Sequence, residues 1–221
     1  METRSTLTGA QAHAQQQAYQ EWTEYHAQQT PMAVYHGDRY EHLTSISQTA
    51  PVTTGRVAQF GVDAGLTLRL LSALYPRQRV LGFDAWHLKS PGLPDVWTGN
   101  IDHSRAFTWS PDAYEQLRGS MPLNVQLVPG LFDHQEIQTH MGDSQAQLIH
   151  IDCDTGPATS TVLEAIRPNL GPGTRILFDE YCNYPGWRQH EHGAWIRFCD
   201  QQKIRYRYLG QGNMDVSIEI L

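Results

Sequence analysis

The segment Leu148-Ile149-His150-Ile151-Asp152-Cys153-Asp154 decides the fold, because a run of mostly apolar residues ends abruptly in acidic ones. A second segment, Ile176-Leu177-Phe178-Asp179-Glu180-Tyr181, has the same form. Such runs are typical of buried strands in a largely parallel sheet. Each strand carries the acids that follow it to the carboxyl edge of the sheet, where open α/β folds bind ligands. We therefore expect both segments to end at one ligand-binding edge.

Three carboxylates, those of Asp152, Asp179 and Glu180, are predicted to converge there. Their mutual repulsion is costly unless a cation or a proton compensates it. Oxygen ligands from two adjacent strand ends suit Mg²⁺, whereas zinc is the weaker alternative because its preferred ligands include nitrogen and sulfur. Asp154 can replace Asp152 as a ligand. The acids can instead cap helices or bind loop amides, which would be a purely structural role.

Size and charge suit one good-sized α/β domain, with 221 residues, a net charge of −7 and 18% charged residues. The acidic balance lacks the basic footprint of a nucleic-acid-binding protein. No apolar run reaches the length of a membrane helix, and the start of the chain lacks the apolar centre of a signal peptide. Three cysteines without CxxC spacing argue against a disulfide framework, so we expect a cytoplasmic protein.

Strands alternate with helices along most of the chain, which predicts an α/β fold: a Rossmann-like, doubly wound, mostly parallel sheet of seven strands. Helices are expected at 66–75, 111–118, 134–140 and 159–167. The last two strands are close in sequence and are expected to pair antiparallel at one edge of the sheet. The predicted strands are 57–62, 79–83, 125–128, 148–151, 175–178, 204–209 and 216–220.

Two segments extend this single predicted domain of residues 1–221. Residues 1–50 form an N-terminal helical extension, in which 9–29 carries Tyr19, Trp22 and Tyr25 at helical spacing. Residues 85–122 are too long for an ordinary connection and hold three tryptophans, so we interpret them as a cap over the substrate site. The helix is expected to pack on the domain. Both segments are also candidate contact surfaces of a homo-oligomer.

A glycine loop follows the first strand and opens a helix: Gln59-Phe60-Gly61-Val62-Asp63-Ala64-Gly65-Leu66-Thr67. Glycines let the backbone turn tightly and approach a ligand, and the helix start offers free N–H groups. Asp84 ends the next strand, where an acid typically binds ribose hydroxyls. The loop lacks the G-x-G-x-x-G pattern of NAD-binding proteins. The spacing favours an adenosyl ligand without a pyrophosphate, which points to S-adenosylmethionine.

On these motifs the chain resembles the class I S-adenosylmethionine-dependent methyltransferases, and more narrowly the macrocin O-methyltransferase-like group that modifies sugars and natural products. The matching stretches occur in family order and cover most of the chain from residue 57 to about 210. They are residues 59–68, Val80-Leu81-Gly82-Phe83-Asp84, Val128-Pro129-Gly130-Leu131-Phe132-Asp133, residues 150–154 and residues 178–187.

The resemblance implies a role for each matching residue. The loop residues would hold the methionine part of the cofactor, Asp84 the ribose, and the segment after the third strand the adenine. Asp152, Asp179 and Glu180 fall where family members bind magnesium. The expected cofactor-binding residues are Gln59, Gly61, Gly65, Thr67, Asp84, Gly130, Leu131, Phe132 and Asp152.

The expected reaction is methyl transfer to a hydroxyl oxygen of a small sugar-like or natural-product acceptor, with Mg²⁺ lowering the pKa of that hydroxyl. Nitrogen acceptors stay open. Candidate general bases are His150, Tyr181, His190 and His192, although His150 within an apolar strand reads more readily as a core histidine. No nucleic-acid or membrane partner is expected.

Two departures from the family pattern support an alternative. Position 59 is Gln rather than an acid, and the loop 155–158 differs from the family sequence. The alternative is a non-catalytic protein that keeps the methyltransferase fold and binds cofactor or ligand. A nucleotide-sugar or phosphate enzyme on this fold ranks lower, because no G-x-x-x-x-G-K-[ST] loop occurs.

Overall fold

The computed structural model describes residues 9–30, 32–52, 54–86 and 110–221, and these contain one sheet of eight strands. The strand order is β1-β7-β8-β6-β5-β2-β3-β4, and every neighbouring pair is parallel except the two pairs that include β8. The strands are β1 (Val34–Tyr35), β2 (Arg56–Phe60), β3 (Val80–Asp84), β4 (Val125–Pro129), β5 (Ala146–Ile151), β6 (Arg175–Phe178), β7 (Tyr206–Gln211) and β8 (Val216–Ile220).

The Rossmann-like, mostly parallel α/β fold is confirmed, and the last two predicted strands do pair antiparallel. The sheet differs in detail from the prediction. The antiparallel strand β8 lies between β6 and β7 rather than at the edge, and the two-residue strand β1 adds an eighth member beyond β7. A strand of two exposed residues carries too little periodicity to be recognised in a sequence.

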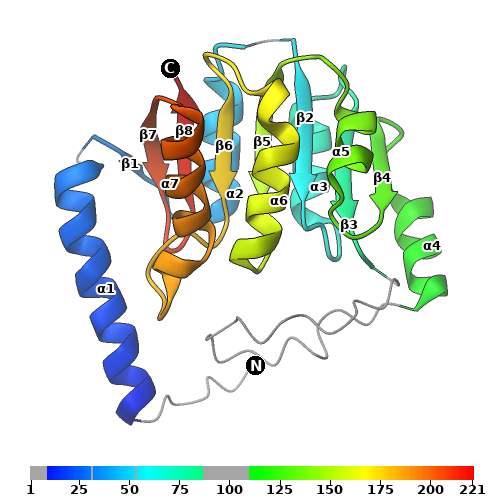
Figure 1. Cartoon of the computed structure of the whole chain (residues 1–221). Helices are drawn as coiled ribbons and strands as arrows, with labels where there is room; N and C mark the ends of the chain where they lie inside the picture. Colours follow the sequence, from blue (N-terminus) through cyan, green and yellow to red (C-terminus); the bar gives the residue numbers. More distant parts are fainter. Residues whose placement is uncertain (1–8, 31, 53, 87–109) are drawn as a thin grey trace.

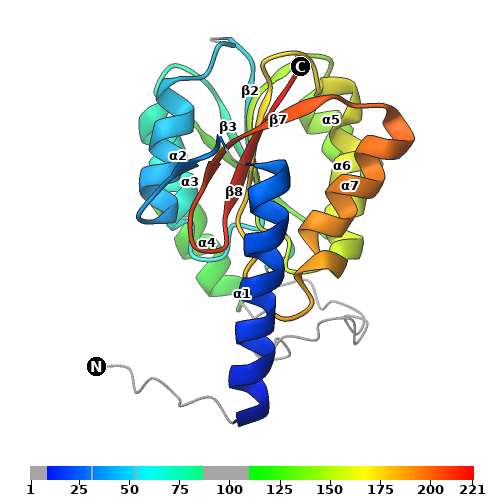
Figure 2. The same cartoon turned by 90° about the vertical axis from the view of Figure 1, so that its left-hand side faces the viewer.

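Helices cover both faces of the sheet, as Figures 1 and 2 show. One face carries α2 and α3, and the other carries α5, α6 and α7, while α1 runs along the side of the sheet that ends in β7 and β1. The helices are α1 (Gly9–Gln29), α2 (Arg39–Gln48), α3 (Leu66–Leu74), α4 (Pro111–Ser120), α5 (His134–Met141), α6 (Gly156–Ile166) and α7 (Glu191–Gln202).

Burial on both faces explains why the central strands read as continuous apolar runs. Every residue of β5 is buried, including the polar Gln147 and His150. The polar residues just before the helices act as N-caps: Asp133 accepts a hydrogen bond from the Glu136 amide and Thr155 from the Ala158 amide. Such caps satisfy amides that the helix itself leaves free, so α5 and α6 each have a fixed start shortly after β4 and β5 end.

The predicted helix 9–29 is α1, and it packs through Trp22, which is buried, while Tyr19 is exposed. Most of the predicted cap, residues 87–109, lies outside the described residues. Its last part is α4, whose Tyr114 and Leu117 are buried. No helix in the part of the chain that the structure describes is both long and apolar enough to cross a membrane.

Candidate active site at the carboxyl edge of the sheet

The candidate site lies where the chain reverses its direction through the sheet. From β2 the chain continues outward to β3 and β4, and from β5 it continues the other way to β6. The carboxyl ends of β2 and β5 therefore flank the topological switch point, which is where open α/β sheets bind ligands. The glycine loop follows β2, and the first predicted acid follows β5.

The glycine loop takes a backbone shape that requires glycine at two positions. Gly61 and Gly65 have φ values of +87° and +76°, in the left-handed region that disfavours other residues. A Cβ on Gly61 would also overlap the carbonyl oxygen of Asp152, and the Asp152 amide donates to the Phe60 carbonyl at 2.8 Å. The loop thus packs directly against the end of β5, with no room for a side chain between them.

Gln59 and Thr67 lie beneath this loop and brace it. The Gln59 amide nitrogen donates to the Gly61 carbonyl at 2.7 Å and to the Thr67 hydroxyl at 2.6 Å. Both side chains are buried, and Gln59 is only 1% exposed. The departure from an acid at position 59 is therefore accommodated inside the protein, where an amide can donate to a carbonyl and a carboxylate cannot.

Asp84 fixes the loop from the next strand. Its Oδ2 accepts hydrogen bonds from the amides of Val62 at 2.7 Å and Asp63 at 2.8 Å, and its Oδ1 accepts a longer one from Trp86 at 3.3 Å. Oδ1 is thus the less engaged oxygen. The carboxylate is placed beside the loop as the sequence predicts, and it also holds the loop in shape.

The segment after β4 brings the predicted adenine-side residues to the same edge. The Gly130 amide donates to the Asp84 carbonyl at 2.9 Å. Leu131 is 47% exposed, whereas Phe132 packs edge-on against Phe60. An exposed apolar residue next to the Asp84 segment is suited to contact a flat aromatic ligand group.

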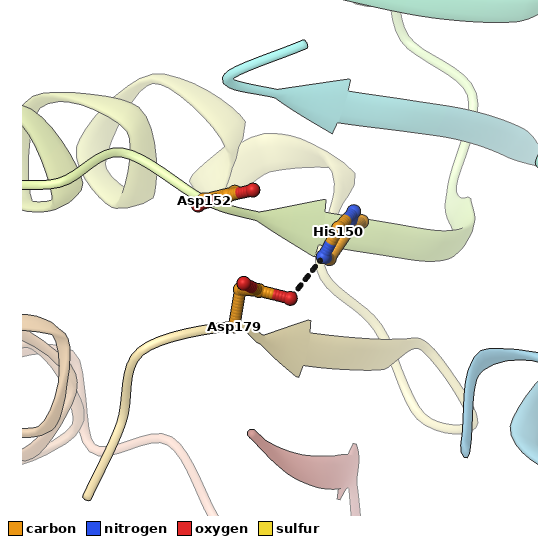
Figure 3. A group of neighbouring side chains, drawn as sticks. All are labelled: His150, Asp152 and Asp179. Atoms are coloured by element: carbon orange, nitrogen blue, oxygen red, sulfur yellow. Dashed lines mark hydrogen bonds and ion pairs between the residues drawn. The ribbon is translucent and has the colours of Figure 1, made fainter. Parts of the chain in front are cut away.

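On the other side of the switch point, His150, Asp152 and Asp179 each offer one ligand atom, and these atoms lie within 4.8 Å of one another (Figure 3). His150 is on β5, Asp152 follows β5 and Asp179 follows β6. The structure thus brings together two of the three predicted metal ligands and adds His150. Asp152 is partly buried, and the other two side chains are buried.

Asp179 has a partner at each carboxylate oxygen. His150 Nε2 lies 3.4 Å from Oδ1, and Arg39 Nη1 lies 2.7 Å from Oδ2. Arg39 is the first residue of α2, which comes from the predicted N-terminal extension. His150 is fully buried, and this position agrees with the interpretation of His150 as a core histidine.

Carboxylates crowd the rest of this edge, and we call Asp152, Asp154, Asp179, Glu180 and Glu191 the acidic cluster. Burial, then neighbouring negative charges, raises the pKa of Asp154 and of Glu180 to about 7. Burial and the charge of Asp179 raise the pKa of Asp152 well above its usual range. Glu180 Oε2 is buried and has no hydrogen-bond partner among the described residues.

Glu191 ties the two strand ends together. It is 1% exposed, and its carboxylate accepts hydrogen bonds from the Glu180 amide at 2.9 Å and the Cys153 amide at 3.4 Å. Burial and the nearby charge of Glu180 raise its pKa well above the usual range. The histidines on either side of Glu191 are predicted from the sequence as candidate bases, whereas Glu191 itself is not, although its place at the start of a helix is visible there.

The remaining candidate bases are enclosed. Tyr181 is fully buried, and its hydroxyl is hydrogen-bonded to the Tyr208 hydroxyl at 2.9 Å. His192 is buried against Tyr25, Tyr181 and Trp187, and this burial lowers its pKa to about 3. His190 is 3% exposed and packs against Tyr184. Their positions favour packing roles, and only His150 joins the acidic edge.

Comparison with known proteins agrees with this geometry. A family model described as a methyltransferase domain matches residues 58–181, which include the glycine loop, Asp84 and the strand-end acids. The match spans more than half of the chain, so the protein belongs to the methyltransferase domain family. No curated protein sequence matches the chain significantly.

Solved structures show the same fold. The calicheamicin methyltransferase CalS11 matches with a TM-score of 0.65 and 19% identity over 99% of this chain and 96% of that chain. The O-methyltransferase NovP matches with a TM-score of 0.60 and 16% identity over 82% of this chain and 78% of that chain. A structure titled "cmcI-D160 Mg-SAM" matches with a TM-score of 0.50 and 12% identity over 84% and 72%. The class I methyltransferase prediction is confirmed.

Proposed function

We propose that the protein transfers the methyl group of S-adenosylmethionine to a hydroxyl oxygen of a small molecule, with a divalent cation, Mg²⁺, at the acidic cluster. The observation that carries this proposal is the meeting of two half-sites at one switch point: a glycine loop with Asp84, and strand-end carboxylates opposite. The names of CalS11 and NovP, both methyltransferases in their titles, support the reaction class. A further match carries Mg and SAM in its title.

The residues of the acidic cluster fit a hard cation. Its donors are mainly carboxylate oxygens, and the buried Glu180 Oε2 lacks a hydrogen-bond partner among the described residues. Asp152 and Asp179 would hold the cation, with Glu180 beside them. When bound, the cation would lower the pKa of the acceptor hydroxyl and orient it. His150 would fix the orientation of Asp179 from the buried side.

Residues of the protein would also position the cofactor and accept the proton of the acceptor. The glycine loop, which packs directly against the end of β5, and Asp84 would place the sulfonium next to that end, so that the methyl group faces the acceptor oxygen. As the methyl moves from sulfur to oxygen, the hydroxyl loses its proton. We assign the proton to the carboxylate oxygen of Asp152 that would not hold the cation, because Asp152 is the partly exposed member of the trio in Figure 3 and can meet the acceptor.

Calorimetric titration with S-adenosylmethionine tests the cofactor half, and no binding at millimolar cofactor would refute the proposal. Transfer of a radiolabelled methyl group to a panel of sugars, phenols and amines, with Mg²⁺ or with EDTA, tests the reaction. The Asp179→Ala variant should lose transfer while its cofactor affinity stays nearly unchanged. Cofactor binding without transfer to any acceptor would favour the non-catalytic binding protein.

A further inference from the structure

Arg39 contacts one carboxylate oxygen of Asp179, the residue that the proposed cation would use as a ligand. Its guanidinium lies 2.7 Å from Asp179 Oδ2, while His150 lies on Oδ1, so both oxygens already have a positively charged or hydrogen-bonding neighbour. A divalent cation that uses Asp179 as a ligand therefore meets the charge of Arg39 at the same carboxylate. Like charges at such short range repel strongly.

The position of Arg39 is built into the fold. Asp38 caps α2 by accepting hydrogen bonds from the amides of Tyr40 and Glu41, at 2.9 and 2.8 Å, which fixes the first turn that carries Arg39. This turn is therefore ordered independently of the contact with Asp179.

One turn further along α2, His42 anchors the helix to the sheet. His42 is fully buried; its Nδ1 lies 2.5 Å from Asp215 Oδ2 and its Nε2 2.7 Å from Ser217 Oγ. Val216, between these two partners, pairs with Phe178, the residue just before Asp179. The buried contacts of His42 therefore hold the start of α2 over the end of β6.

The Arg39 side chain can leave without unfolding this arrangement. It is 47% exposed, whereas its partner Asp179 is 3% exposed. A long, half-exposed arginine can turn into water while its helix stays anchored through His42. The carboxylate, in contrast, stays at the buried end of β6.

We propose that Arg39 is a resident counter-cation of the acidic cluster, which must leave Asp179 before a divalent cation binds there. This inference rests on the cation part of the proposed function. Arg39 thus stabilises the cation-free protein and weakens its affinity for divalent cations. Through Arg39, helix α2 thereby lowers the affinity for divalent cations of a site that β5 and β6 build.

Binding of Mn²⁺ alone, followed by electron paramagnetic resonance and by calorimetry, tests the inference without an acceptor. The Arg39→Gln variant should bind Mn²⁺ at least about tenfold more tightly than the unmodified protein, because the competing charge is gone. Arg39→Lys keeps a charge but loses the planar fork, so its affinity should lie between the two.

A matched control is Arg207→Gln, which removes another half-exposed arginine paired with a buried carboxylate, Glu219, at 2.6 Å. It should leave Mn²⁺ affinity unchanged. Thermal unfolding of each variant verifies folding: Arg39→Gln should melt lower than the unmodified protein without cation, and Mn²⁺ should raise its melting temperature by more.

Equal or weaker Mn²⁺ binding by Arg39→Gln would overturn the role of Arg39 and leave a cation site in place. Absence of Mn²⁺ binding in both proteins would overturn the cation part of the proposed function together with this inference. Titration with S-adenosylmethionine reports separately on the cofactor half.

Discussion

The glycine loop after β2 and the acidic cluster after β5 and β6 share one sheet edge but differ in how far their negative charges are compensated. In the loop, the single carboxylate of Asp84 accepts two short hydrogen bonds from loop amides. The Gln59 nitrogen has two acceptors, while its buried Oε1 has no hydrogen-bond partner among the described residues. In the cluster, five carboxylates meet with Arg39 as the cation on Asp179, and Glu180 Oε2 has no hydrogen-bond partner among the described residues.

This difference predicts how each half of the site responds to a substitution or to a change of charge. The loop is preorganised, so a change there should damage its shape and the affinity for the cofactor together. The acidic cluster is held in a state of excess negative charge, so it is stabilised by whatever brings positive charge or protons.

Gly61→Ala should be the most damaging change. Alanine at a φ of +87° is strained, and its Cβ would overlap the Asp152 carbonyl oxygen. We expect a loss of about 3 kcal/mol or more in the free energy of unfolding, measured by urea denaturation. Gly119→Ala in α4 is the control, since nothing lies near its Cβ position. If Gly61→Ala were as stable as the control, the loop would not be rigid.

Asp84→Ala should have the next largest effect, a loss of affinity for the cofactor. Three amides of the loop region, those of Val62, Asp63 and Trp86, would lose their acceptor. We expect the Kd for S-adenosylmethionine to rise about 100-fold, because hydrogen bonds to a charged group are among the stronger ones. Calorimetry measures it, with the exposed Asp200→Ala as control. An unchanged Kd would mean that Asp84 neither binds the cofactor nor shapes the loop.

A pH series separates the acidic cluster from the histidine next to it. The raised pKa values of Asp154 and Glu180 mean that these groups stabilise the fold as pH falls. His192 acts the other way: burial lowers its pKa to about 3 from the ordinary histidine value of about 6.5, so stability is lost as pH falls below that value.

His192→Phe should therefore stabilise the protein in acid. At pH 5 the unfolded chain binds a proton that the folded His192 refuses, which costs about 2 kcal/mol. The variant should recover this amount in urea denaturation at pH 5 relative to pH 7.5. His134→Phe, at an exposed position of α5, should not. Equal pH profiles for His192→Phe and the unmodified protein would contradict the burial of a neutral imidazole.

Glu191→Gln should have the smallest effect. Because the pKa of Glu191 is raised well above its usual range, the neutral amide resembles the form that the fold favours. Its oxygen can still accept from the Glu180 amide, so we expect a change within about 1 kcal/mol in unfolding free energy. Glu191→Ala leaves that amide buried without an acceptor and should cost more. Equal losses in both variants would show that the negative charge itself is needed.

The sequence predicted the elements whose signal is local. β6 and β8 were predicted with the bounds that the structure has, and α1 likewise, because apolar runs, turns and helical spacing are written along the chain. The glycine loop and its two glycines were predicted because their backbone need is specific to one residue type. Asp152 and Asp179 were predicted to meet because parallel strands end at one edge.

The features that the sequence does not predict depend on contacts between distant segments. The helix α2 has only Leu43 and Ile46 as buried apolar residues, and it is held by the polar contacts of His42, so no apolar pattern marks it. Arg39 reaches Asp179 only after α2 docks, and nothing near either residue in sequence indicates that pairing. Glu191 is recognised as a brace only when two strand ends are seen beside it.

The anchoring of α2 has a consequence for the order of assembly. His42 is made before its buried partners, because Asp215 and Ser217 follow it by 173 and 175 positions in the chain. Until β8 is inserted between β6 and β7, α2 lacks the buried polar partners that hold its first turns over the end of β6, where Arg39 meets Asp179. The placement of Arg39 at the acidic cluster therefore depends on a strand far away in the sequence, and loss of β8 should weaken the contact between Arg39 and Asp179.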